Sequence, residues 1–206
     1  MEIYSLSPYT FGSNCYVMIA QNSLGNNVAA VVDPSVDTFR ITRLLEEKKA
    51  KLEFIVLTHG HFDHIASLDS LRDATGAPAF IHSEDAEMLC DGNKNAYAFF
   101  FGEDKHWRDA ERLLSDGELL TLGTETLKVI STPGHSKGSI CLLGEGFLIT
   151  GDTLFADNIG RCDLHGGNMM QMYASLSLLS ELDGGLTIHP GHGETNKLEN
   201  ALSRLV

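Results

Sequence analysis

The chain has 206 residues, a hydrophobic fraction of 43% and a formal net charge of −13. This length suits a single domain with a sizeable core, and this composition is that of an ordinary globular protein. The acidic balance argues against nucleic acid as a partner, because binding to a phosphate backbone requires basic patches.

Strands open the chain, and an alternation of strands and helices follows. Residues 14–20 and 28–32 predict a hairpin around a turn at 24–27. Residues 39–49 predict a helix, and the apolar run 54–57 predicts the next strand. The residues of this helix expected to face the core are Phe39, Leu44 and Leu45.

The alternation continues beyond the middle of the chain. Residues 67–75 predict a helix, 79–82 a short strand and 83–89 another helix. An apolar stripe at helical spacing predicts a later helix packed on the core, and its members are Met169, Met172, Tyr173, Leu176 and Leu179. The last helix is expected to begin at Asn196, because Glu199 lies three residues on, as in a capping box.

A cluster of metal-ligand side chains comes directly after the apolar run 54–57. Three histidines and one aspartate fall within six positions, namely His59, His61, Asp63 and His64. Neutral imidazole and carboxylate are the usual ligands of zinc and similar divalent ions. The single residue between His59 and His61 lets both rings reach one ion, and Gly60 allows the backbone to approach the metal closely. We therefore predict a metal site in this loop.

The same arrangement recurs three times later in the chain. Apolar strand patterns at 127–131, 147–150 and 186–188 each run into a turn that bears glycine or proline. These turns present His135, Asp152 and His192. Open α/β sheets place ligand sites beyond the carboxyl ends of their strands. With the first loop, the turns supply seven ligand-type side chains, which is enough for two divalent ions.

These motifs resemble those of metallo-β-lactamase-fold hydrolases, and within that superfamily the chain is most similar to the glyoxalase II (hydroxyacylglutathione hydrolase) group. The resemblance rests on His-x-His-x-Asp-His at 59–64 and on the stretches 132–136, 151–155, 160–164 and 190–195. It runs from about Ser13 to Thr195. It implies a single domain over residues 1–206, folded as a four-layered αββα sandwich.

The resemblance also implies a role for each candidate ligand. His59, His61 and His135 would hold the first metal, and Asp63, His64 and His192 would hold the second. Asp152 would bridge the two ions, and a hydroxide shared between them would be the nucleophile. Asp63 would also orient this hydroxide as a catalytic residue. Zinc is the expected metal, with iron or manganese as alternatives.

Other polar residues have less defined roles. Asp33 closes the strand 28–32, where it is either a partner for a ligating imidazole or an ordinary turn residue. Four more histidines have no place in the ligand set, and we interpret them as structural or surface residues. They are His82, His106, His165 and His189.

The substrate is harder to predict than the metal site. By resemblance, Arg161 is a candidate substrate-binding residue that could pair with a carboxylate. Full-length glyoxalase II proteins have a C-terminal helical extension that binds glutathione, and we expect none here. Glu194 stands where longer relatives carry a tyrosine. The aromatic segment 97–101 is either a pocket wall or lid, or hydrophobic packing beneath an inserted segment.

We therefore predict a metal-dependent hydrolase of thioesters, with a small-molecule thioester as its partner. One alternative is a mononuclear iron persulfide dioxygenase of very similar sequence, which metal content and oxygen consumption would distinguish. Another is a hydrolase of a different ester or of a lactone, which substrate profiling would distinguish.

The expected compartment is the cytoplasm. The four cysteines show no C-x-x-C spacing, which is typical of reduced thiols rather than of a disulfide framework. The first residues lack the basic and apolar regions of a secretory signal. No apolar run approaches the roughly 18 residues of a membrane span, so we expect no membrane partner.

Overall fold

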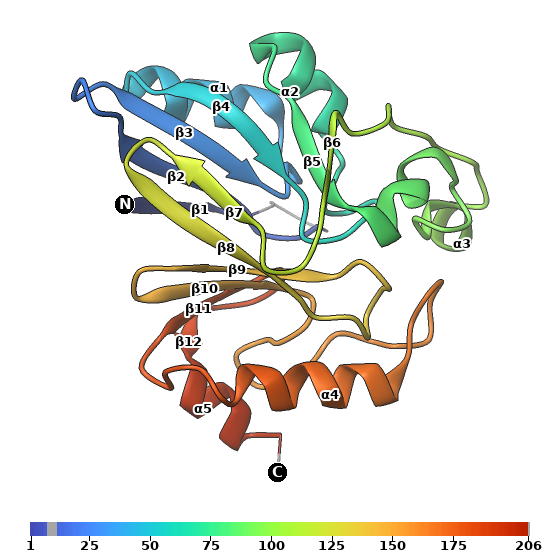
Figure 1. Cartoon of the computed structure of the whole chain (residues 1–206). Helices are drawn as coiled ribbons and strands as arrows, with labels where there is room; N and C mark the ends of the chain where they lie inside the picture. Colours follow the sequence, from blue (N-terminus) through green and yellow to red (C-terminus); the bar gives the residue numbers. More distant parts are fainter. Residues whose placement is uncertain (8–11, 206) are drawn as a thin grey trace.

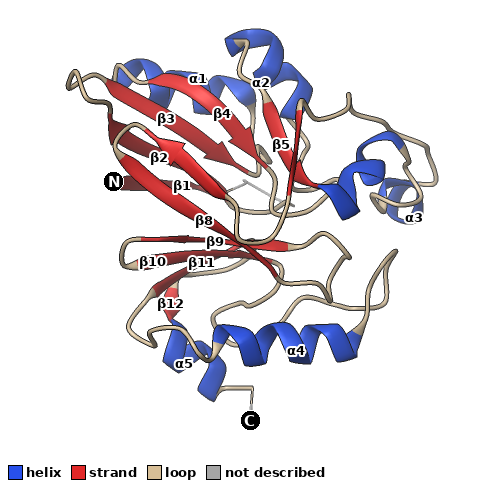
Figure 2. Cartoon of the chain, in the orientation of Figure 1, coloured by secondary structure: helices blue, strands red, loops and turns tan. Residues whose placement is uncertain are grey.

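Two six-stranded sheets face each other at the centre of the computed structural model, which describes residues 1–7 and 12–205 (Figure 1). The first sheet has the order β1-β2-β3-β4-β5-β6, and the second has the order β12-β11-β10-β9-β8-β7. Helices cover the outer faces of both sheets (Figure 2). The four αββα layers and the single domain that the sequence predicted are confirmed.

The first sheet combines an antiparallel part with a parallel part. Its strands are β1 (Glu2–Leu6), β2 (Cys15–Gln21), β3 (Asn27–Val32), β4 (Lys51–Val56), β5 (Ala79–His82) and β6 (Arg112–Leu114). The pairs from β3 to β6 are parallel. Parallel neighbours need a crossover connection. Helix α1 (Thr38–Glu47) joins β3 to β4, and α2 (Leu68–Thr75) joins β4 to β5.

Two short helical segments join β5 to β6, namely the 3₁₀ helix η1 (Ser83–Cys90) and α3 (Tyr97–Phe101). The strands of the second sheet are β7 (Leu119–Leu122), β8 (Glu125–Ser131), β9 (Ile140–Gly144), β10 (Phe147–Gly151), β11 (Thr187–Pro190) and β12 (Asn196–Lys197). Helix α4 (Met169–Leu179) joins the parallel strands β10 and β11, and α5 (Leu198–Ser203) follows β12.

Three buried clusters fill the spaces between the four layers. Alternate residues of β2 show how a strand with two covered faces contributes to two of these clusters. Val17 packs towards α1 and α2, whereas Met18 packs between the two sheets. The third cluster lies between the second sheet and the helices α4 and α5, and includes Met172 and Leu198. This packing fixes the strand ends that carry the site.

The helix predicted at 83–89 is present as the 3₁₀ helix η1. Other local predictions were wrong. Phe39 is 68% exposed because it lies on the side of α1 opposite the buried Ile41. Of the α4 stripe, Met169 and Tyr173 are exposed. The last helix begins at Leu198, because the backbone of residues 196–197 pairs with β11 instead of capping the helix.

Across the described part of the chain, no helix has both the length and the apolar character needed to cross a membrane.

Candidate metal centre

Four loops carry the seven candidate ligands, and each loop follows the carboxyl end of a strand. Residues 59–64 follow β4 of the first sheet, and His135, Asp152 and His192 follow β8, β10 and β11 of the second. The loops meet where both sheets end. Five of the seven side chains are buried, and the other two, Asp63 and His192, are partly exposed. The structure therefore brings all seven together.

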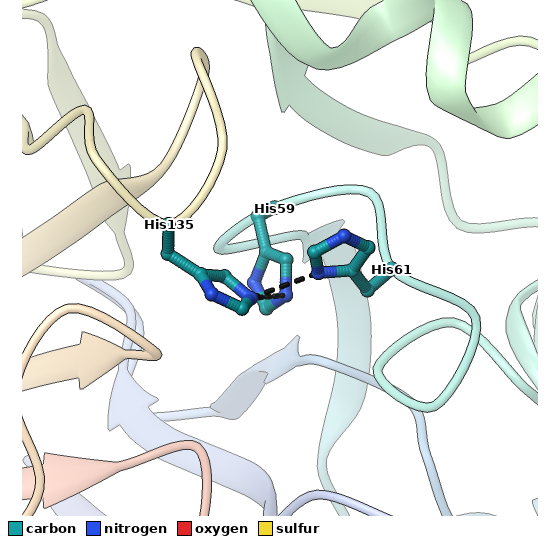
Figure 3. Close-up of side chains that lie close together, drawn as sticks. All are labelled: His59, His61 and His135. Carbon is teal, nitrogen blue, oxygen red and sulfur yellow. Dashed lines mark hydrogen bonds between the residues drawn. The ribbon is translucent and has the colours of Figure 1, made fainter. Parts of the chain in front are cut away.

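The first ligand set comprises His59, His61 and His135, whose rings point towards one another (Figure 3). His135 Nε2 lies 2.8 Å from His61 Nδ1 and 3.2 Å from His59 Nε2. Burial, reinforced by the neighbouring imidazoles, lowers the pKa of His59 well below its usual value and that of His61 to about 3. Both rings are thus neutral near pH 7, which leaves nitrogen lone pairs for a divalent ion.

The second ligand set comprises Asp63, His64 and His192. Asp63 Oδ2 lies 3.2 Å from His192 Nε2 and 3.8 Å from His64 Nε2. Asp152 stands between the two sets. Its Oδ1 lies 3.3 Å from His64 Nε2, and its Oδ2 lies 3.5 Å from Nε2 of both His135 and His192. One carboxylate therefore contacts both sets.

The two histidines of the second set and Asp152 hold opposite charges in the protein without metal. Burial disfavours a charged His64, but the nearby Asp152, Asp63 and Asp33 outweigh it and hold the pKa of His64 well above its usual value. Burial also opposes charge on His192, whose hydrogen bonds with Asp152 and Asp63 raise its pKa to about 9. Burial would raise the pKa of Asp152, but His64 and His192 hold it well below the usual range. A divalent ion would replace these protons, since ligand imidazoles must be neutral.

Unpaired polar atoms support the fit of a metal to these residues. Among the residues that the structure describes, Nε2 of His61, Nε2 of His64 and Oδ1 of Asp152 are buried without a hydrogen-bond partner. Buried polar atoms are normally paired, so a cluster of unpaired ones needs an explanation. Imidazole nitrogens and a carboxylate oxygen are the donors that zinc, iron and manganese accept.

Asp33 contacts His64 of the second ligand set on the ring nitrogen that faces away from Asp152. Its Oδ2 accepts a hydrogen bond from Thr58 Oγ1 at 2.7 Å and lies 2.8 Å from His64 Nδ1. Its Oδ1 accepts the N–H of Thr58 at 2.8 Å. With its Nδ1–H donated to Asp33, His64 presents Nε2 to Asp152. Of the two interpretations left open by the sequence, the contacts favour the partner of a ligand.

Asp85 of η1 was missed by the sequence reasoning. This buried carboxylate accepts hydrogen bonds from Ser136 Oγ at 2.6 Å, Gly138 N–H at 2.7 Å and Gly60 N–H at 3.2 Å. It thus ties the loop of residues 59–64 to the loop that carries His135. Burial raises the pKa of Asp85, and the three donors partly offset this effect.

Gly60 is also needed for a reason that the sequence did not indicate. A Cβ at this position would lie 2.5 Å from Cβ of Met88, so η1 packs closely against this loop.

Asn14 was also missed, and it holds the loop that carries His192. Its side-chain amide donates to the carbonyl oxygens of Pro190 at 3.1 Å and Gly193 at 2.9 Å. Tyr16 Oη donates to the same Pro190 oxygen at 2.6 Å. These contacts connect β2 of the first sheet to the end of β11 in the second. Because 176 positions separate Asn14 from Pro190, no local sequence signal could have revealed the pair.

A cavity of about 280 Å³ opens beside the ligands. Its walls include His61, Asp63, His135, Asp152 and His192 together with Phe62, Ala96, Phe100, Phe155, Gly160, Arg161 and Leu164. Ligand side chains thus share this space with apolar ones, so a small molecule in the cavity would contact both.

Arg161 lines the cavity, but a neighbouring carboxylate already binds its guanidinium group. Arg161 Nε and Nη2 donate to the two oxygens of Asp163 at 2.6 and 2.8 Å. The backbone oxygen of Arg161 lies 2.7 Å from His135 Nδ1, which orients that imidazole. The position therefore has a positioning contact that the sequence did not indicate.

The aromatic segment 97–101 proves to be both packing and wall. Tyr97 packs against the core cluster that contains the buried Trp107. Phe99 and Phe101 are 68% and 57% exposed, and Phe100 lines the cavity while remaining 51% exposed.

The four remaining histidines lie outside the ligand groups found among the described residues. His82 caps η1 and lies 3.1 Å from Ser131 Oγ. His106 Nε2 lies 3.2 Å from a carboxylate oxygen of Asp104, and His165 Nε2 lies 3.5 Å from one of Glu87. His189 packs against the ring of Tyr16.

The same fold occurs in known proteins. The model of the metallo-beta-lactamase superfamily matches residues 8–192, a range that contains all four ligand-bearing loops. A probable metallo-hydrolase of Bacillus subtilis is 33% identical over 191 residues, which cover 90% of this chain and 88% of that protein. The crystal structure of the BLEG-1 B3 metallo-beta-lactamase is 30% identical, with a TM-score of 0.88 and coverage of 98% of this chain and 97% of that chain. The di-iron-bound form of TTHA1623 is 26% identical, with a TM-score of 0.79 and coverage of 97% and 96%.

Proposed function

The chain belongs to the metallo-beta-lactamase superfamily, and from this premise we propose that it hydrolyses thioesters at a centre of two divalent metal ions, as glyoxalase II enzymes do. Membership and the similarity to a probable metallo-hydrolase support a metal-dependent hydrolase. The observation that carries the binuclear centre is the position of Asp152, whose two oxygens lie 3.3 to 3.5 Å from imidazoles of both ligand sets.

In this proposal each ligand set would hold one divalent ion, and Asp152, which lies between the two sets, would be available to both. Bound divalent ions polarise a carbonyl group and lower the pKa of water towards neutrality. Asp63 lines the cavity and is partly exposed, which supports the proposal that its carboxylate orients the attacking water. Asp33 and the backbone oxygen of Arg161 fix the orientations of His64 and His135.

The test combines metal analysis with thioester hydrolysis. Protein purified without added metal is assayed for bound zinc, iron and manganese, and for hydrolysis of S-D-lactoylglutathione before and after chelation. We expect close to two ions per chain and loss of activity on chelation. Asp152→Ala should lose both ions, whereas His192→Ala should mainly weaken the second site. A single iron per chain together with oxygen uptake on glutathione persulfide would replace the hydrolase with the dioxygenase.

A second candidate function is β-lactam hydrolysis, which the likeness to the BLEG-1 B3 metallo-beta-lactamase favours. Activity on a penicillin and on a carbapenem, measured beside the thioester, distinguishes the two. A kcat/KM for a β-lactam above that for every thioester would make β-lactam hydrolysis the main function.

A further inference from the structure

We propose that the substrate carries an apolar group, either an aromatic ring or an alkyl chain of medium length, and that a phenylalanine wall beside the ligand sets binds it. We define this wall as Phe62, Phe100 and Phe155. The inference rests on the proposed function, because it names the class of thioester that the same site takes.

The wall lies directly against the ligands. Phe62 stands between His61 and Asp63 in the chain, and its ring centroid lies 5.5 Å from that of Phe100 in α3. The ring of Phe155, which lines the same cavity, lies 5.8 Å from that of His192, edge to face. A group in the cavity that touches the ligands therefore has aromatic rings within reach.

The exposure of α3 indicates that the wall is incomplete without a bound molecule. Phe100 is 51% exposed although it lines the cavity, and its neighbours Phe99 and Phe101 are exposed more. Clusters of exposed large apolar side chains commonly mark binding sites. An apolar group in the cavity would cover the free face of Phe100 and remove apolar surface from water.

Charge argues against a strongly anionic group at this wall. The guanidinium group of Arg161, which lines the cavity, already binds Asp163 through two hydrogen bonds. Asp63 adds a carboxylate to the same cavity.

The size of the cavity is compatible with an aromatic ring. The cavity measures about 280 Å³, and an apolar cavity of about 150 Å³ is enough for benzene.

The test varies one side of the thioester at a time on metal-loaded protein. The acyl series runs from acetyl to hexanoyl and phenylacetyl on N-acetylcysteamine, and the thiol series pairs one acetyl group with methyl, hexyl and benzyl thiols. We expect kcat/KM to rise at least about tenfold with apolar size in one series, a magnitude typical of extra methylene groups in a pocket. The series that rises identifies which side of the thioester the wall binds.

Variants then assign the effect to the wall. Phe100→Ala should remove most of this rise, so that kcat/KM falls further on the thioester with the larger apolar group than on the acetyl-methyl thioester, whereas Phe100→Leu should keep part of the rise. Phe39→Ala is the matched control, because Phe39 is another exposed phenylalanine on a helix and does not line the cavity. A flat or falling series, or a Phe100→Ala effect that is equal on all substrates, would overturn the inference.

Binding separates this inference from the proposed function. Hexyl and methyl thioethers, which lack the carbonyl group, are titrated calorimetrically into the metal-loaded protein. Tighter binding of the hexyl thioether that Phe100→Ala abolishes supports the apolar wall even if no thioester is hydrolysed, in which case only the proposed function fails. Thioester hydrolysis with equal binding of both thioethers and a flat series supports the function and refutes the wall.

Discussion

Replacing Asp85 with alanine should weaken both the fold and the metal site. Asp85 is 1% exposed and accepts hydrogen bonds from two backbone N–H groups, those of Gly60 and Gly138, and from Ser136 Oγ. Alanine would leave both N–H groups buried without an acceptor, while Ser136 keeps Ser139 Oγ at 2.7 Å. Each unpaired buried donor costs about 1–3 kcal/mol, so the free energy of unfolding of the metal-free protein should fall by roughly 2–6 kcal/mol.

The same substitution should reduce affinity at the first ligand set. Gly60 lies between His59 and His61, and Ser136 follows His135, so Asp85 sets the spacing of the two loops that carry these rings. Residues that hold metal ligands in place typically contribute tenfold to a hundredfold to metal affinity. We expect the affinity for one of the two ions to fall by a factor in that range.

Urea unfolding of the metal-free protein and cobalt titration against a chelator measure the two effects separately. Asp85→Asn should give an intermediate loss, because its amide keeps one acceptor oxygen. Glu84→Gln is the control, since Glu84 is the exposed neighbour on η1. If Asp85→Ala unfolds within about 0.5 kcal/mol of the wild type, as ordinary surface substitutions do, and binds cobalt normally, the loops are not held by this carboxylate.

Three other predictions concern the centre and its surroundings. Asp33→Ala should weaken the second cobalt ion tenfold to a hundredfold in the same titration, because it frees His64 Nδ1; unchanged binding would refute this. Arg161→Ala should raise the KM of a carboxylate-bearing thioester only slightly, because Asp163 already binds the guanidinium group. Asp163→Asn should lower this KM by freeing the guanidinium group. A large KM increase in Arg161→Ala would contradict the conclusion that Asp163 occupies Arg161 before substrate binds. In the metal-free protein, the raised pKa of His192 stabilises the fold fully below its unfolded value of 6.5, and this contribution is lost as pH rises through about 9. Urea midpoints should therefore fall between these pH values, and fall less in His192→Gln.

The candidate ligands could be read from the sequence because each lies just beyond an apolar strand. Strand patterns such as 54–57 and 147–150 are local, and the parallel pairing of such strands places their carboxyl ends at one edge. Helical periodicity was less informative. It predicted the buried Met172 and Leu176, but Tyr173 is one position away, about 100° around the helix, and is exposed.

The residues that support the ligands could not be predicted in this way. Asp85 contacts Ser136 across 51 positions, and Asn14 contacts Pro190 across 176. Neither has a local pattern that distinguishes it from an ordinary loop or strand residue. Their roles depend on how the two sheets pack, which is the level of structure that a single sequence determines least directly.

The metal centre and the apolar wall are formed by different parts of the chain. The ligand loops follow core strands of both sheets, so the packing that stabilises the fold also assembles the metal centre. Phe100 instead lies on α3, in the connection from β5 to β6, which supplies none of the seven ligands. Changes in α3 can therefore alter the apolar wall while Asp85, which lies earlier in the same connection, still holds the ligand loops. It follows that the ligand motif predicts the reaction type, whereas the substrate must be inferred from the cavity.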